Sequence, residues 1–118
     1  MAKLILGGQE YPLVMTVGVL DGMGKLGVDI QGIPGYFSPG KRPVGEAIDN
    51  GLEFLRRLME AAQEAAFIRD GTEYTELPDP MLLRRLLTPG QIWGLCDAAI
   101  TDSLVRTVEA APEKNEAQ

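Results

Sequence analysis

Residues 3–27, KLILGGQEYPLVMTVGVLDGMGKLG, decide the fold of this chain. Alternating apolar residues on both sides of Gly7 and Gly8 predict a β-hairpin over residues 2–16, because glycine readily adopts the positive φ angles of a tight turn. The apolar period then changes to three, which predicts a short helix over residues 17–26. Two strands alone are marginally stable, so we expect the hairpin to pack on helices.

The predicted short helix contains three glycines, Gly18, Gly22 and Gly24. Each costs about 1 kcal/mol relative to alanine inside a helix, so a compensating contact is expected. In a membrane, the spacing of Gly18 and Gly22 would favour helix dimerisation. In a soluble chain we expect instead that these glycines let another backbone of the same domain approach closely.

Four further segments follow along the chain. Residues 28–42 are rich in Gly and Pro and predict a long loop. Apolar residues at spacings of three and four predict a long helix over residues 43–68. Shorter helices are predicted over residues 80–87 and 89–110, since an N-cap pattern precedes each of them.

The remaining segments set the limits of the domain. Residues 72–77, TEYTEL, are polar and β-prone, which is typical of a short strand or of an arm without regular structure. Pro112 is expected to end the last helix, and residues 112–118 are expected to form a disordered tail. The sequence therefore predicts one α+β domain over residues 1–111, predominantly helical, with an N-terminal β-hairpin packed on a three- to four-helix domain.

The composition supports a single aliphatic core. Hydrophobic residues make up 45% of the 118 residues but aromatic residues only 6%, so Leu, Ile, Val, Met and Ala must fill the interior. A chain of this length buries enough surface to fold unaided. The single cysteine, Cys96, excludes an internal disulfide, and no apolar run suits a signal peptide or a membrane helix, so we expect a cytoplasmic protein.

Charge and residue types disfavour nucleic-acid binding and catalysis. Eleven Lys and Arg against 17 Asp and Glu give a net charge of -6, and phosphates repel such a chain unless its basic residues cluster. The sequence contains no histidine, and Cys96 lies on the apolar face of the last predicted helix. The glycines of the first helix lack the order of a dinucleotide or P-loop motif. We therefore expect no enzyme activity, no catalytic residue, no cofactor and no metal.

Apolar side chains in loops are the main candidates for protein binding. Ile33, Tyr36 and Phe37 lie in the predicted loop, where they either anchor a partner or fold back onto the core. Trp93, near the start of the last helix, is more typical of a core residue than of a site. Residues 72–77 either add a strand to a partner or serve as a plain linker.

The order of the first elements resembles that of phage tail assembly chaperones. The residues that carry the resemblance are Gly8-Gln9-Glu10-Tyr11-Pro12-Leu13, Lys25-Leu26-Gly27 and Leu87-Thr88-Pro89-Gly90-Gln91. The resemblance implies a mainly helical protein of a phage or prophage tail operon that keeps the tape-measure protein soluble and recruits tail-tube subunits. It also implies action in the host bacterial cytoplasm and absence from the finished virion. The chain departs from the pattern in its loop at 28–42 and in the TEYTEL segment.

A second interpretation is a small acidic regulatory or inhibitor protein that binds a basic partner surface. Binding of that kind depends on clustered carboxylates and weakens steeply with salt, whereas an apolar chaperone contact does not. Both interpretations are compatible with a homo-oligomer, and neither involves nucleic acid or a membrane.

Overall fold

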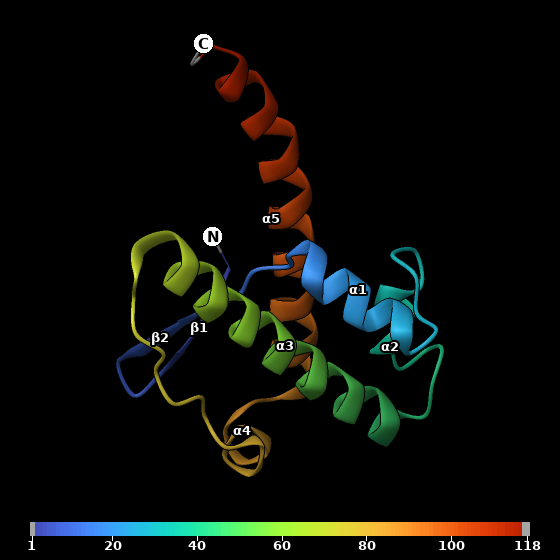
Figure 1. Ribbon diagram of the computed structural model, residues 1–118. Helices are drawn as coiled ribbons and strands as arrows, with labels where there is room; N and C mark the ends of the chain where they lie inside the picture. The colour runs from blue at the N-terminus through green and yellow to red at the C-terminus, as the bar shows by residue number, and fades with distance from the viewer. Residues whose placement is uncertain (1, 117–118) are drawn as a thin grey trace.

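The structure is a computed structural model that describes the backbone of residues 2–116 and the side chains of residues 2–103. A long central helix runs through the molecule (Figure 1). The N-terminal hairpin and two short helices pack against it, and the last helix crosses behind it. The elements are β1 Lys3–Leu6, β2 Gln9–Pro12, α1 Val17–Lys25, α2 Ile33–Tyr36, α3 Val44–Asp70, α4 Pro80–Leu86 and α5 Pro89–Glu116. The predicted α+β, mostly helical fold with an N-terminal hairpin packed on helices is confirmed.

The hairpin turns at Gly7 and Gly8, whose φ angles of 55° and 83° suit the two central positions of a type I′ turn. Its second strand is shorter than the sequence predicted, because the chain leaves the sheet after Pro12. The N–H of Leu13 still donates to Ala2, but the N–H of Val14 donates to the carbonyl of Leu58 in α3. The chain beyond β2 is therefore attached to the central helix and no longer to β1.

Thr16 is the N-cap of helix α1, and its hydroxyl accepts the N–H of Val19. The helix ends before Gly27, which has a φ of 82°. A Cβ at Gly22 would lie 2.7 Å from Nη1 of Arg57, so the close neighbour is a side chain of α3. The prediction that another backbone approaches closely was therefore wrong at Gly22, where the neighbour is the guanidinium group of Arg57. Gly18 meets only the Thr16 hydroxyl within 4 Å.

The central helix α3 buries a wider face than the single stripe predicted from spacing. Ala47, Phe54 and Leu58 are buried beside the expected Leu52, whereas the expected Val44 is exposed. The face is wide because α1, α2, β2 and α5 all pack on α3. α5 approaches most closely at Gly51, where a Cβ would lie 2.8 Å from Cγ2 of Ile92.

Both predicted N-caps are present. Oδ1 of Asp79 accepts the N–H of Met81 at the start of α4, at 2.9 Å. At the start of α5, the N–H of Thr88 donates to Gln91 Oε1 and the N–H of Gln91 donates to Thr88 Oγ1, at 2.9 and 3.2 Å. These reciprocal bonds form the predicted capping box.

Helix α5 continues beyond the end that Pro112 was expected to impose. It extends to Glu116, and its C-terminal half projects away from the other elements (Figure 1). A proline has a helical φ and removes one backbone hydrogen bond, so it disfavours a helix interior without ending every helix. Residues 112–116 of the expected disordered tail are therefore helical, and residues 117–118 lie outside the described residues. Among the described residues, no helix has the length and apolar character needed to cross a membrane.

Candidate protein-binding surfaces

Two of the three loop residues proposed as partner anchors belong to the core. Ile33 is 1% exposed and Phe37 is 3% exposed, and the Phe37 ring stacks on Phe54 with centroids 5.6 Å apart. The helical turn α2 places both side chains on α3, because positions four residues apart lie on one face of a helix. The anchor interpretation therefore does not apply to Ile33 and Phe37, which fold back onto the core.

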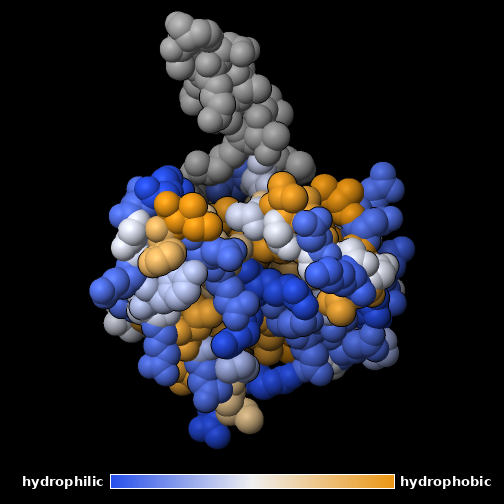
Figure 2. Space-filling view, in the orientation of Figure 1, coloured by the Kyte–Doolittle hydropathy of each residue, from blue (hydrophilic) through white to orange (hydrophobic). Residues whose placement is uncertain are grey.

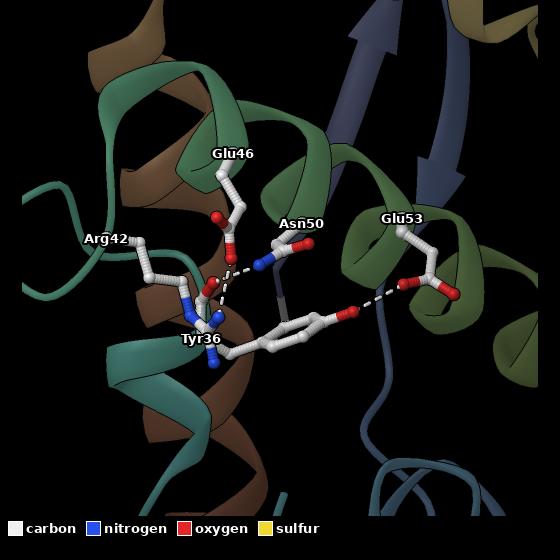
Figure 3. A network of polar contacts seen from close by, with 5 residues as sticks. All are labelled: Tyr36, Arg42, Glu46, Asn50 and Glu53. Atoms are coloured by element: carbon white, nitrogen blue, oxygen red, sulfur yellow. Dashed lines mark hydrogen bonds and ion pairs between the residues drawn. The ribbon is translucent and has the colours of Figure 1, made fainter. Parts of the chain in front are cut away.

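Tyr36 lies between them at the surface and fastens the loop to α3 (Figure 3). Its hydroxyl donates to Glu53 at 2.7 Å, and its carbonyl accepts from Asn50 at 2.8 Å. The guanidinium of Arg42 lies 5.4 Å from the ring centroid and pairs with Glu46 at 2.6 Å. Burial and the hydrogen bond to Glu53 raise the pKa of Tyr36 to about 12. Tyr36 has a structural role, and its role in partner binding stays a prediction.

The single cysteine and the single tryptophan are packed into the structure. Cys96 is buried, its Sγ lies 3.7 Å from the carbonyl of Gly51, and burial raises the pKa of its thiol far above the ordinary value. Trp93 is half-buried against the core, as the sequence suggested. Among the described residues, no cluster of three or more His, Cys, Asp or Glu side chains is arranged to hold a metal ion.

The segment between α3 and α4 offers a different kind of surface. Residues 72–77, here called the arm, have no strand structure and return along α3 as an extended segment (Figure 1). The side-chain amide of Gln63 accepts the N–H of Thr75 at 2.9 Å and donates to the carbonyl of Thr75 at 2.8 Å. Between residues 73 and 78, no backbone–backbone hydrogen bond joins the arm to the rest of the described chain. Gln63 thus holds the backbone of the arm, while the Tyr74 ring lies beside Phe67 and Leu77 packs against the core.

Unfilled space lies on both sides of the arm, and we call the two hollows together the arm groove. The larger hollow, about 550 Å³, lies between the arm, α3 and the start of α1; its lining includes Val19, Ala61, Glu64 and Tyr74. The smaller, about 140 Å³, lies between the arm, α3 and β2; its lining includes Tyr11, Met59, Ala62 and Glu73. Gln63, Thr75 and Leu77 line both hollows. The arm therefore crosses a space that it does not fill.

Large apolar side chains are exposed at the end of α3 and on the arm. Ile68 is 76% exposed, Tyr74 62% and Phe67 53%, and the rings of Phe67 and Tyr74 lie 5.4 Å apart. Figure 2 shows apolar surface over the C-terminal end of α3, next to the hydrophilic surface of its middle. On α4, Met81, Leu82 and Leu86 are also exposed. Exposed large apolar side chains in contact, as Phe67 and Tyr74 are, are typical of interaction surfaces.

This surface is only partly predictable from the sequence. Phe67 and Ile68 follow Ala66 at the end of the predicted apolar face, and their bulk outside that face is a signal of exposure. Gln63 has no such signal, because a polar residue on the outer side of a helix is normally only solvated. Its contact with Thr75 depends on the path of the arm, which the sequence left open.

No family model, curated protein or solved structure matches this chain. The surfaces of the molecule and the order of its elements are therefore the observations that bear on its function.

Proposed function

We propose that this chain is a phage tail assembly chaperone that binds the tape-measure protein and tail-tube subunits during tail morphogenesis. The order of elements that carries the resemblance supports the proposal: a hairpin, a short helix directly after it, a long central helix, and a last helix that begins with a capping box. As a chaperone, the protein acts in the host cytoplasm and is absent from the finished virion.

The single observation that carries the proposal is the exposed apolar surface formed by Phe67, Ile68 and Tyr74. A chaperone of this kind must cover apolar side chains of a helical partner before the partner assembles. Burial of apolar surface contributes roughly 25 cal/mol per Å², so a few large side chains give a contact of moderate and reversible strength. Helix α4 adds Met81, Leu82 and Leu86 and is held by the buried Leu83 and by an ion pair between Arg84 and Asp49.

The second candidate, an acidic inhibitor of a basic partner surface, also has a specific observation in its favour. Exposed carboxylates lie close to the same apolar residues: Glu64 and Glu73 line the arm groove, and Glu76 is exposed on the arm. The two functions differ in their salt dependence. An inhibitor held by carboxylates loses affinity steeply as salt rises, whereas apolar capture does not.

The test is co-expression with the tape-measure protein of the gene cluster that encodes this chain. We expect the wild-type chain to raise the soluble fraction of that protein and the double variant Phe67→Ser and Ile68→Ser to do so much less. The matched control is Ile5→Ser with Val44→Ser, which also removes two exposed apolar side chains but on β1 and at the start of α3. A gene cluster without a tape-measure protein, or equal solubilisation by all three chains, contradicts the proposal.

A further inference from the structure

Both hydrogen bonds between Gln63 and the arm go to backbone atoms. The Gln63 amide satisfies both the N–H and the C=O of Thr75, at 2.9 and 2.8 Å, as a neighbouring strand would. The Thr75 side chain is not needed for either bond, and residue 75 is itself exposed. Any extended segment can therefore make the same pair of hydrogen bonds, because every residue except proline carries the same two groups.

The arm is a poor match for the groove in shape. Residues 72–76 are all exposed, and only Leu77 places an apolar side chain partly inward. The hollows beside the arm, about 550 and 140 Å³, contain the apolar side chains Val19, Ala61 and Met59. These wall side chains are themselves buried. An apolar side chain that enters either hollow would therefore gain contact with them and would itself leave water, which the exposed side chains of residues 72–76 do not do.

The arm is also a poor match in charge. It brings Glu73 into the hollow that Glu10 lines. Tyr74 and Thr75 line the other hollow together with Glu60, Glu64 and Arg57, and the Arg57 guanidinium pairs with Glu53. Glu10 pairs with Lys3 and Glu60 with Arg56, but no ion pair is formed by Glu64 or Glu73 among the described residues. Like charges on the occupant and the walls weaken the attachment, whereas an occupant with basic side chains would gain from the same carboxylates.

We propose that the arm groove is the docking site for an extended segment of a partner protein that carries basic side chains on both sides of an apolar one, and that the arm occupies this site until such a segment displaces it. The Gln63 amide binds the backbone of the segment, its apolar side chain enters the larger hollow, and its basic groups face Glu10, Glu64 and Glu60. The inference deepens the proposed function, on which it rests, by assigning the site and the chemistry of its partner.

Displacement makes the arm a built-in competitor. A partner segment binds only the fraction of molecules in which the arm has left Gln63, so its apparent affinity is reduced by that fraction. Loosening the arm should strengthen binding, and fastening it should weaken binding. These opposite directions separate competition from simple damage to the surface.

The probes are two synthetic peptides, one with the sequence of residues 71–79 and one with lysine at its two glutamate positions. Binding to the full chain is followed by NMR, through the side-chain amide of Gln63 and the indole of Trp93 as a distant reference. We expect the lysine peptide to bind about tenfold more tightly at low salt, since the carboxylates that line the groove repel the glutamates of the native peptide and attract the lysines. Tighter binding of the native peptide instead would indicate exchange of arms between two copies and would overturn the proposal.

Three variants of the full chain test the competition with the lysine peptide. Thr75→Pro removes the N–H that Gln63 accepts and should strengthen peptide binding. Glu73→Lys with Glu76→Lys gives the arm the charges of the lysine peptide and should weaken peptide binding. The loss of affinity should exceed that in the charge control Asp29→Lys with Asp97→Lys, in which the net charge changes equally but elsewhere. Gln63→Leu removes the same pair of hydrogen bonds from the arm and from the peptide, so it should strengthen peptide binding less than Thr75→Pro does while leaving the melting temperature nearly unchanged. The proposal is wrong if Thr75→Pro binds no more tightly than wild type or if the two lysine double variants behave alike.

The result is independent of the tape-measure experiment. If the lysine peptide binds as expected but no tape-measure protein is solubilised, the docking site stands and the chaperone role fails. If solubilisation occurs and the peptides do not compete with the arm, the chaperone role stands and the docking site is wrong.

Discussion

Two irregular segments flank the central helix, and they differ in how their side chains are used. Residues 28–42 precede α3, contain the turn α2 and bury Ile33 and Phe37. Residues 71–79 follow α3, and between 72 and 76 every residue is exposed. The first segment is part of the core, whereas the second lies on the surface as far as Glu76, with Thr75 bonded to Gln63, and returns to the core only at Leu77 and Pro78.

The difference shows that apolar residues in a loop are buried when their spacing lets them reach the core together. Ile33 and Phe37 are separated by four residues, and one helical turn between them brings both onto α3. In the arm, Tyr74 and Leu77 are separated by three residues of extended chain, so their side chains point in different directions. Only Leu77 packs against the core, and Tyr74 stays at the surface beside Phe67.

The largest expected effect on stability comes from a substitution in the first segment. Phe37→Ala should lower the free energy of unfolding by about 3–5 kcal/mol, because it removes a buried ring that stacks on Phe54. Tyr74→Ala, which removes an aromatic ring from the arm, should change it by less than about 0.5 kcal/mol. Urea unfolding of both variants measures the contrast, and similar losses from the two would refute the distinction between the segments.

The second effect tests how Tyr36 fastens the first segment to α3. Tyr36→Phe removes the hydrogen bond to Glu53 and should cost about 1 kcal/mol of stability. The folded pKa of about 12 lies above the ordinary value of 10.0, so the folded chain holds the phenolic proton more tightly than the unfolded chain. The stabilisation due to this shift is therefore complete below pH 10 and is lost as the pH rises toward 12.

The measurement compares urea unfolding of the wild type and of Tyr36→Phe below pH 10 and at a pH approaching 12. Other groups titrate in both chains, so only the difference between them reports Tyr36. We expect the advantage of the wild type to shrink across this range. A difference that stays constant or grows would mean that the Glu53 contact is absent in solution.

How far the sequence predicts such differences depends on whether a pattern is local. The hairpin turn at Gly7 and Gly8, the capping box at Thr88 and the long helix follow from neighbouring residues, and all were predicted. The burial of Phe37 was left open, because a Gly- and Pro-rich segment has no period to assign a face, although Pro34 early in a turn was a signal for α2.

The parts that could not be predicted depend on contacts distant in sequence. Gln63 and Thr75 are 12 residues apart, and their pairing requires the arm to turn back along α3. Arg57 occupies the space beside Gly22, which the glycine spacing alone attributed to a backbone. The walls of the arm groove are equally non-local, because Glu10 of the hairpin and Glu64 of α3 lie beside the arm only in the folded chain.

The smallest expected effect concerns the arm, and it is local. Gln63→Ala should change the free energy of global unfolding by less than about 0.5 kcal/mol, because both of its hydrogen bonds lie at the exposed surface. Hydrogen exchange should nevertheless respond. In the wild type, the amide of Thr75 should exchange more slowly than those of Glu73 and Glu76, which have no such acceptor, and Gln63→Ala should remove that protection.

Gln31→Ala is the matched control, since Gln31 is exposed and is not bonded to the arm. It should leave the exchange of Thr75 unchanged. If Gln63→Ala lowered the free energy of global unfolding by several kcal/mol, the arm would be part of the stable fold, as residues 28–42 are. A partner could then not displace it without destabilising the domain. Selective loss of Thr75 protection with unchanged global stability would instead mean that the arm opens without unfolding the core, which displacement by a partner segment requires.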